Sequence, residues 1–202
     1  NTGGMGAYSP APIISKDLEK KIIKRIVEPT LNALKARKNP YTGFLYVGLM
    51  IKNNEPYLIE YNVRMGDPEC QVIMPRLKTD LVIILNAALE NKLNKINIKW
   101  SKKKCMATVL CSKGYPGKYK INTTINLKNI KLSNDSFIFH AGTVFRNNSL
   151  VSNGGRVLNV VVLGDTFLKI KNKIFQIIKK INWRYGFFRK DIGWRVIKFK
   201  WE

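Results

Sequence analysis

The 202-residue sequence is short of acidic residues: it has 13 Asp and Glu against 36 Lys and Arg, and a formal net charge of +23. It has only three cysteines, an odd number without C-x-x-C spacing, which excludes a disulfide framework and a zinc site. It contains no run of about 18 apolar residues that would span a membrane. It also lacks the basic and then apolar start of a secretory signal. These absences predict a cytoplasmic protein with ordinary free thiols and no membrane partner.

The excess of positive charge does not by itself predict a nucleic-acid partner. Lys and Arg can displace counterions from nucleic-acid phosphates, but here Lys is dispersed along the whole chain and accompanied by many Ile and Asn. That combination is typical of the compositional bias of an AT-rich genome. We therefore expect no specific nucleic-acid role, although a basic surface attracts anionic substrates. The apolar fraction of 45% is ordinary for a globular core.

The first forty residues combine a loop with a helix. Residues 1–12 contain three Gly and two Pro and are predicted to form a loop. Ser15 can cap a helix that begins at Lys16, because its hydroxyl can accept a bond from a free N–H of the first turn. Pro29 lacks a backbone N–H and is predicted to kink or divide this helix.

A hairpin and a second helix are predicted next. Residues 42–52 are mostly aromatic and aliphatic and are predicted to form a strand buried on both faces. Turn residues at 53–56 lead into a return strand over 57–63. Asp80 is predicted to cap a helix. The buried positions predicted for this helix are Leu81, Ile84, Leu85 and Ala88.

The pattern changes across the polar, Lys-rich segment 91–104, which we interpret as a domain boundary. Short strands are predicted beyond it at 106–111, 137–141, 143–146 and 156–163. A helix from Thr166 to Ile181 is predicted to bury one apolar stripe. The residues of that stripe are Phe167, Ile170, Ile174, Ile177, Ile178 and Ile181.

The segment from Ile59 to Glu69 holds three carboxylates, an amide and a guanidinium in a chain that is otherwise poor in acid. Glu60 and Asn62 are two residues apart on a predicted strand, so their side chains project to the same face. Their oxygens are hard ligands of the kind that Mg²⁺ prefers, and Mg²⁺ keeps nucleotide phosphates as further ligands. A polar strip facing solvent fits the same spacing equally well.

Two further charged residues extend this junction. Arg64 continues the alternation of Glu60 and Asn62, so we expect it on the same face, where a guanidinium can neutralise charge on a transferred phosphoryl group. An ion pair with Asp67 or Glu69 is the alternative for Arg64. Asp67 lies in a tight turn, where it can contact a substrate amine or simply cap the turn.

Glycines and isolated charged side chains supply weaker candidates. Gly3, Gly4 and Gly6 can present backbone N–H groups to an anion, although no Gly-Lys-Ser or Gly-Lys-Thr of a Walker loop follows them. Arg156 follows a Gly-Gly turn and could either contact a phosphate or be an ordinary surface residue. His140 is the only histidine and has no legible catalytic partner, so a structural role is favoured.

Six segments resemble, in order and across nearly the whole chain, the phosphoribosylamine–glycine ligase (glycinamide ribonucleotide synthetase) family, ATP-grasp enzymes of purine biosynthesis. They are Asn1–Pro12, Tyr41–Tyr46, Arg64–Glu69, His140–Thr143, Asn153–Val157 and Arg189–Arg195. The Arg-x-Gly-Asp-Pro-Glu run is highly specific. Met65 departs from the Phe that is more frequent in the family, and this change is apolar and conservative.

The resemblance implies an α+β fold with two parts. Residues 1–100 would form the second part of an ATP-grasp domain, an antiparallel sheet with helices. Residues 101–202 would form the family's small, β-rich C-terminal domain. In the family, an N-terminal domain and the first part of the ATP-grasp fold precede these segments. We therefore expect this chain to be a piece of a longer protein. By itself, the piece is expected to be inactive and to bind ATP weakly or not at all.

The resemblance also implies a reaction: ATP-dependent ligation of glycine to 5-phosphoribosylamine through a glycyl phosphate. Glu60 and Asn62 match the family's ligands for Mg²⁺ or Mn²⁺, and Arg64 and Asp67 would act at the reacting groups. The candidates for binding the cofactor are Gly3, Gly4, Gly6 and Arg156. The alternatives are another ATP-grasp carboxylate–amine ligase, a basic nucleic-acid-binding module and a non-catalytic remnant. The oligomeric state does not follow from the sequence.

Overall fold

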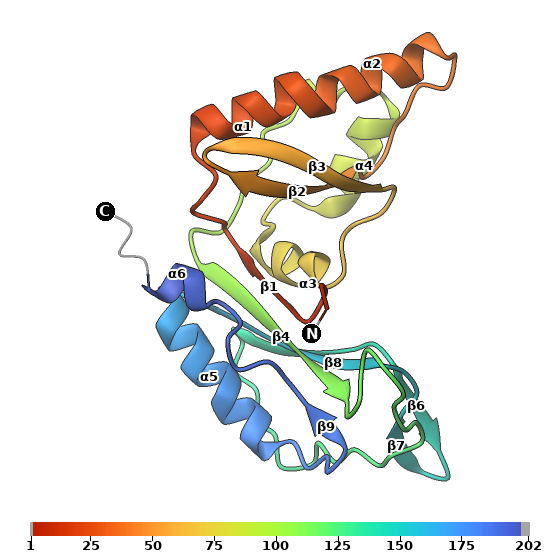
Figure 1. Cartoon of the computed structure of the whole chain (residues 1–202), viewed down its shortest axis with the longest axis vertical. Helices are drawn as coiled ribbons and strands as arrows, with labels where there is room; N and C mark the ends of the chain where they lie inside the picture. The colour runs from red at the N-terminus through yellow and green to blue at the C-terminus, as the bar shows by residue number, and fades with distance from the viewer. Residues whose placement is uncertain (1, 199–202) are drawn as a thin grey trace. The chain divides into compact units, whose positions relative to one another are not determined.

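The computed structural model describes residues 2–198 (Figure 1). They fall into two compact units, which we call unit 1 and unit 2. Unit 1 comprises Asn1–Pro10, Asp67–Lys78 and Trp100–Glu202, and unit 2 comprises Ala11–Gly66 and Thr79–Lys99. The chain thus crosses between the units more than once. Compact units need not coincide with the domains of a family, so the division into 1–100 and 101–202 stays a prediction.

Unit 1 is built on a five-stranded antiparallel sheet. Its strands lie in the order β1 (Gly6–Ser9), β4 (Lys104–Ser112), β8 (Arg156–Gly164) and β5 (Ser136–His140), and β9 (Gly186–Phe187) pairs with the end of β4. The central strands β4 and β8 are buried along almost their whole length. Burial on both faces explains why their sequences are nearly continuous apolar runs.

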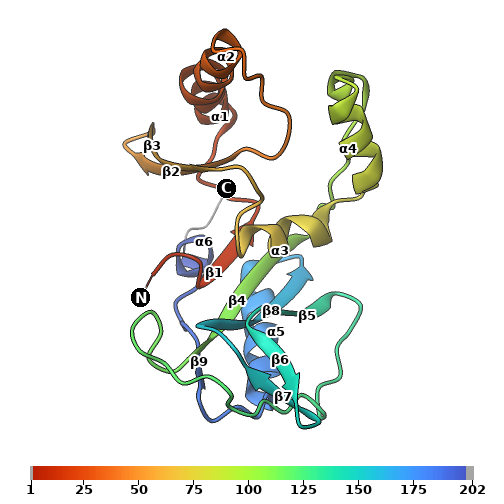
Figure 2. The same ribbon diagram turned by 90° about the vertical axis from the view of Figure 1, so that its right-hand side faces the viewer.

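Helices cover both faces of this sheet. On one face lies α5 (Phe167–Lys180), seen behind the strands in Figure 2, and its buried residues pack with Met106, Val160 and Val162. On the other face α3 (Glu69–Ile73) contacts β1 and β4, and its Val72 packs with a separate group of strand residues. The two-residue alternation along β4 and β8 sends neighbouring side chains to opposite helices.

Shorter elements complete unit 1. A 3-10 turn (Met74–Arg76) follows α3, β6 (Thr143–Arg146) and β7 (Ser149–Ser152) form a small antiparallel hairpin, and α6 (Trp194–Lys198) lies beside α5. The strands and the helix predicted beyond residue 104 are confirmed to within one or two residues at each end. Thr166 caps α5 by accepting a bond from the N–H of Lys169.

The predicted loop over residues 1–12 is wrong for the stretch from Gly6 to Ser9, which forms β1. This strand has four residues and is defined by its pairing with β4, opposite Cys105 to Thr108. A local pattern of Gly and small residues cannot report such a distant partner. In residues 2–198, no helix combines the length and the apolarity needed to cross a bilayer.

Unit 2 places a helical rod against a hairpin (Figure 1). The rod consists of α1 (Lys16–Ile22), a π-helical segment (Ile23–Val27) and α2 (Glu28–Ala36). The predicted division of the helix takes the form of this π-helical segment, and Pro29 stands in the first turn of α2. The hydroxyl of Ser15 accepts a bond from the N–H of Leu18, which confirms the predicted cap.

The hairpin pairs β2 (Tyr46–Lys52) with β3 (Glu55–Asn62). Lys21 Nζ and Arg25 Nη1 lie 2.5 and 2.7 Å from the two carboxylate oxygens of Glu55 and so tie the helical rod to the hairpin. The prediction that the first strand is buried on both faces is wrong: β2 is only partly buried, and Met50 is 59% exposed. An apolar run shows that a strand can be buried, but unit 2 covers this one only in part.

The second helix of unit 2 is α4 (Leu81–Leu89), followed by a 3-10 turn (Leu93–Lys95). Asp80 Oδ1 accepts a 2.7 Å bond from the N–H of Val82, which confirms the predicted cap. Leu85, predicted to be buried, is exposed, and Ala87 is the buried residue of this helix. The reason is that α4 is apolar around most of its circumference, so periodicity does not single out its inner face.

The three cysteines, all within the described residues, are thiols that form no disulfide, as predicted. Cys105 and Cys111 lie buried in β4, where burial raises the pKa of their thiols to about 12 and about 11. Cys70 is half-buried in α3, and burial raises its pKa as well. These thiols are protonated packing groups at neutral pH.

Candidate functional site

Glu60 and Asn62 lie side by side at the end of β3. Asn62 Nδ2 donates to Glu60 Oε1 over 3.1 Å, as expected for residues two apart on a strand. Glu60 is exposed and Asn62 is half-buried. Their contact leaves Glu60 Oε2 and Asn62 Oδ1 as acceptors. The hairpin therefore offers one carboxylate oxygen and one amide oxygen from adjacent positions of one face.

Gly48 makes room for this pair from the neighbouring strand. It stands opposite Glu60 in the hairpin, and a Cβ at Gly48 would lie 2.9 Å from Glu60 Cγ. The register then shifts, so that Leu49 faces Leu58 and Ile59 is an extra residue of β3. Such bulges bend a strand and re-aim its side chains. The sequence signal for this close approach is a glycine inside an apolar strand, and the strand predicted over 42–52 took no account of it.

The pair fits a metal that is shared with a substrate. Within residues 2–198, no three His, Cys, Asp or Glu side chains gather in an arrangement that could hold a metal ion. Mg²⁺ needs no such cage, because it is commonly bound by one or two carboxylates together with substrate phosphates and water. The hard oxygen donors of Glu60 and Asn62 suit that second mode of binding.

Arg64 does not continue the alternation of the strand. The strand ends at Asn62, so Arg64 lies two residues beyond it, in a bend. Its side chain is exposed, and Nη1 donates to the carbonyl oxygen of Met65 over 2.9 Å. Strand alternation therefore does not extend to Arg64, since it holds only while the backbone stays extended, and the role expected of Arg64 stays a prediction.

Arg156, Asp67 and Gly4 form one cluster in unit 1. Arg156 Nη2 lies 3.0 Å from Asp67 Oδ2, and Nη1 donates to the carbonyl oxygens of Asp67 and Gly4 over 2.7 and 3.2 Å. Asp67 Oδ1 also accepts a bond from Gln71 Nε2. The planar fork of one guanidinium thus holds two distant segments together. Arg156 is more than an ordinary surface residue, and the ion-pair partner of Asp67 is Arg156.

The three candidate glycines have different surroundings. Gly4 has φ +73°, and a Cβ there would lie 2.4 Å from Arg156 Nη1, so this turn requires glycine. Gly3 has open space around it. Gly6 lies in β1 rather than in a loop, and a Cβ there would lie 2.7 Å from the side chain of Ile192. Glycine at this position permits close packing.

His140 stands at the end of β5 and is exposed. Its Nδ1 lies 3.0 Å from the hydroxyl of Thr143, at the start of β6. This contact across a tight turn agrees with the structural role that was predicted for it.

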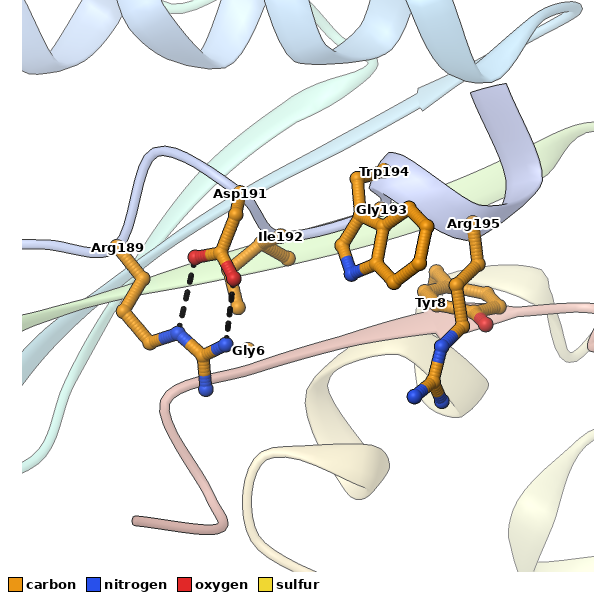
Figure 3. A pocket seen from close by; sticks show the side chains of 8 residues that line it. All are labelled: Gly6, Tyr8, Arg189, Asp191, Ile192, Gly193, Trp194 and Arg195. Atoms are coloured by element: carbon orange, nitrogen blue, oxygen red, sulfur yellow. Dashed lines mark hydrogen bonds and ion pairs between the residues drawn. The ribbon is translucent and has the colours of Figure 1, made fainter. Parts of the chain in front are cut away.

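Unit 1 contains a further pocket, of about 280 Å³, that was not predicted from the sequence (Figure 3). It is lined by Gly6, Tyr8, Arg189, Asp191, Ile192, Gly193, Trp194 and Arg195. The segment 189–195 was matched to a family motif but was given no site role. Two arginines around an Asp and a Gly, in a chain whose cations are mostly Lys, were the signal that could have marked it.

An ion pair between Arg189 and Asp191 fixes two of the charged side chains of this pocket. Arg189 donates from Nε and Nη2 to the two carboxylate oxygens of Asp191 over 2.9 and 2.6 Å. These bonds hold the pKa of Asp191 below its usual range and raise the pKa of Arg189. Arg195 lies over the ring of Trp194, with 5.4 Å between its Cζ and the ring centroid.

Two domain models of one family match the sequence. Residues 1–70 match the phosphoribosylglycinamide synthetase ATP-grasp (A) domain, and residues 105–195 match the phosphoribosylglycinamide synthetase C domain. Asn1, at the start of the first match, lies outside the described residues. The two matches follow the order that the sequence motifs predicted.

Named relatives match nearly the whole chain. The phosphoribosylamine–glycine ligase of Agrobacterium fabrum is 45% identical over 197 residues, covering 98% of this chain and 46% of the relative. The ligase of the same name from Escherichia coli is 44% identical over 200 residues, covering 98% and 47%. The crystal structure of such a ligase from Thermotoga maritima matches with a TM-score of 0.81 at 32% identity, covering 95% of this chain and 46% of that chain. The chain spans about half the length of the curated relatives it matches.

The comparisons and the architecture agree. Antiparallel sheets with packed helices make up both units, as the predicted α+β class requires, and the fold matches that of the Thermotoga maritima ligase. The predicted resemblance is likewise confirmed by both domain models. The chain belongs to the phosphoribosylglycinamide synthetase family.

Proposed function

We propose that this chain is part of a phosphoribosylamine–glycine ligase, which joins glycine to 5-phosphoribosylamine with ATP and Mg²⁺ or Mn²⁺ to give glycinamide ribonucleotide. The observation that carries the proposal is the similarity to ligases of that name over 98% of the chain. The ATP-grasp description of the first matched domain supports the use of ATP. The adjacent oxygens of Glu60 and Asn62 support a shared metal.

The reaction has two steps. First, the γ-phosphoryl group of ATP is transferred to the carboxylate of glycine, giving glycyl phosphate and ADP. The amine of phosphoribosylamine then attacks the carbonyl carbon, the C–O bond to the phosphate breaks, and the amine loses a proton as inorganic phosphate leaves. A divalent metal held by Glu60 and Asn62 would neutralise charge on the phosphate oxygens when bound.

Arg64 and Asp67 are the proposed catalytic residues. Arg64 is exposed just beyond β3, and a guanidinium beside a phosphoryl group can neutralise the charge that develops during transfer. Asp67 would orient the substrate amine with its carboxylate. Its ion pair with Arg156 supports this role, because the pair holds the carboxylate in place.

Gly3, Gly4, Gly6 and Arg156 are the proposed contacts for the phosphates of the cofactor. The turn at Gly3 and Gly4 best supports such a contact, since its backbone can approach an anion closely. Arg156 would fix this turn through the carbonyl of Gly4 while adding positive charge beside it. Gly6 is the weakest of the four, because it lies within a paired strand.

A chimera tests the proposal directly. The chain would replace the matched 47% of the Escherichia coli ligase, and formation of ADP and glycinamide ribonucleotide would be measured with each substrate omitted in turn. We expect turnover that requires glycine, phosphoribosylamine, ATP and a divalent metal. Product formation with bicarbonate and none with glycine would favour another ATP-grasp ligase instead.

The metal assignment needs its own variants in that chimera. Glu60→Gln keeps the shape of the side chain but removes its charge, so we expect kcat to fall roughly 100-fold, with the loss largest at limiting Mg²⁺. Glu90→Gln is the matched control, because Glu90 is an exposed carboxylate that pairs with Lys92. Unchanged turnover in Glu60→Gln at limiting Mg²⁺ would refute the metal role.

The 202-residue chain by itself is proposed to be inactive and to bind ATP weakly, since it spans about half the length of its relatives. Isothermal titration of the chain with ATP and Mg²⁺ measures this property. Tight, saturable binding would show that these residues hold most of the nucleotide site. The cytoplasmic location stays a prediction.

A further inference from the structure

The pocket between β1 and the segment 189–195 brings two guanidinium groups to one side of unit 1 (Figure 3). We propose that this pocket binds the phosphate group of the sugar phosphate substrate, with Arg195 and Arg189 as its ligands. The inference rests on the proposed function, which supplies 5-phosphoribosylamine as the substrate class. It assigns the recognition of the phosphoribosyl moiety to this pocket of unit 1.

Arg195 is the free cation of the pocket. It is exposed, and none of the ion pairs within residues 2–198 involves it. Its Cζ lies 5.4 Å from the centroid of the Trp194 ring, a cation–π contact that uses none of its N–H donors. A guanidinium with unused donors can bind two phosphate oxygens at once.

Arg189 contributes a second, fixed donor. Asp191 engages its Nε and Nη2, and Nη1 points away from that carboxylate (Figure 3). Because both oxygens of Asp191 already accept bonds from Arg189, the carboxylate is poorly placed to attract a cation. The charged groups lining the pocket are two arginines and one aspartate, so the pocket carries a net positive charge that favours an anion.

The backbone around these arginines is tightly packed. Ile192 lies against Gly6, where a Cβ would come within 2.7 Å of its side chain. Gly193 has φ +76°, and a Cβ there would lie 2.2 Å from Met106 Cε. Glycine permits both close approaches, and the positive φ favours it at Gly193; together the two contacts hold the segment 189–195 on the sheet. A site held in this way loses little conformational entropy when a ligand binds.

The size and the lining of the pocket suit a pentose phosphate. Its volume of about 280 Å³ is just below the range of roughly 300–1,000 Å³ that is typical for drug-sized ligands, so a whole nucleotide is a poor fit. Tyr8 adds a hydroxyl that can bond a sugar hydroxyl, and its ring is fixed edge-on against Phe167, with 5.6 Å between the centroids. One face of β1 thus presents both Gly6 and Tyr8 to the ligand.

Binding of ribose 5-phosphate to the 202-residue chain tests the inference, with chemical shifts or calorimetry as the readout. We expect saturable binding, competition by inorganic phosphate, and no detectable binding of ribose. Arg195→Gln should weaken the affinity for ribose 5-phosphate about tenfold or more. Arg195→Lys keeps the charge but loses the planar, two-pronged donor geometry, so its affinity should lie between those of the wild type and Arg195→Gln. Arg184→Gln is the matched control, because Arg184 also stacks on its neighbour, Tyr185, and lies outside the pocket.

The outcomes separate this inference from its alternatives. Equal affinity in Arg195→Gln and Arg184→Gln would overturn it, since binding would then follow the net charge of the chain. Ribose that binds as tightly as ribose 5-phosphate would overturn it too, and so would a wild-type chain that binds neither. The two proposals can also fail separately. If Arg195→Gln selectively loses affinity for ribose 5-phosphate while the chimera makes no glycinamide ribonucleotide, the pocket is supported and the proposed function is refuted.

Discussion

Replacing Arg156 by Gln should loosen the attachment of the Gly-rich turn to the start of α3 within unit 1. The wild-type guanidinium makes one ion pair with Asp67 and donates to the carbonyl oxygens of Asp67 and Gly4. The shorter, neutral amide of Gln cannot span these three acceptors. The turn and the helix would then be joined through the contacts of α3 with β1 and β4.

The expected cost follows from exposure. The side chains of Arg156 and Asp67 are 30% and 42% exposed, so the ion pair itself contributes only about 0.5 kcal/mol. Each bond from the charged donor to a carbonyl contributes about 0.5–1 kcal/mol, at the low end because water can replace it. We expect Arg156→Gln to lower the free energy of unfolding of unit 1 by about 2 kcal/mol.

Urea unfolding followed by tryptophan fluorescence measures this change. The described tryptophans, Trp100, Trp183 and Trp194, belong to unit 1, so their signal reports the unit that the substitution affects. Arg146→Gln is the control, since Arg146 lies exposed on β6, and we expect a change within about 0.5 kcal/mol. In a double-mutant cycle, Asp67→Asn removes the ion pair but keeps both carbonyl acceptors, so the coupling energy should be only about 0.5 kcal/mol.

Two results would refute this reasoning. A loss in Arg156→Gln no larger than that in Arg146→Gln would mean that the cluster does not stabilise unit 1. A coupling energy equal to the whole loss would mean that the ion pair, and not the carbonyl bonds, holds the two segments together.

Three further predictions concern the packing of unit 1. Ile174→Ala should cost about 3 kcal/mol of unfolding free energy because Ile174 is fully buried in α5, whereas Leu168→Ala on the same helix, 55% exposed, should cost under about 0.5 kcal/mol; equal losses in urea titrations would contradict the assigned inner face. Stability should fall as the pH rises above 9, because the unfolded Cys105 thiol ionises there while the folded thiol keeps its proton up to a pKa of about 12. The unfolding free energy should fall by about 1.4 kcal/mol per pH unit. Cys105→Ala should remove this pH-dependent loss; if the loss is unchanged in the variant, the buried thiol is not its source. Gly193→Ala should lower the unfolding free energy by about 2 kcal/mol, because φ is +76° and the new methyl group would collide with Met106; an unchanged melting temperature would contradict this strain.

Local patterns in the sequence account for much of the secondary structure. The inner stripe of α5 repeats every three or four residues, and its predicted members from Phe167 to Ile178 are buried. Ser15 and Asp80 cap helices as expected, because a cap involves residues only two or three positions apart. The contact between Glu60 and Asn62 is local in the same sense, and the two-residue period of a strand predicts it.

Local patterns fail where an element depends on a distant partner. β1 has four residues and exists through its pairing with β4, some hundred positions along the chain. The exposure of β2 and of Leu85 depends on what covers them rather than on their own apolar character. β3 ends at Asn62, so strand alternation does not determine where the side chain of Arg64 points, and no periodicity marks where an extended backbone bends.

By itself, the sequence determined the family, the α+β class and the adjacency of the two oxygen donors on β3. Only the tertiary structure decided that Arg156 clamps Gly4 to Asp67, and that Gly6 and Tyr8 meet the segment 189–195 around one basic pocket. The physical reason is the range of the interactions. Periodicity and capping arise from bonds between near neighbours, whereas these contacts join residues separated by most of the chain and form only when the sheet brings their backbones together.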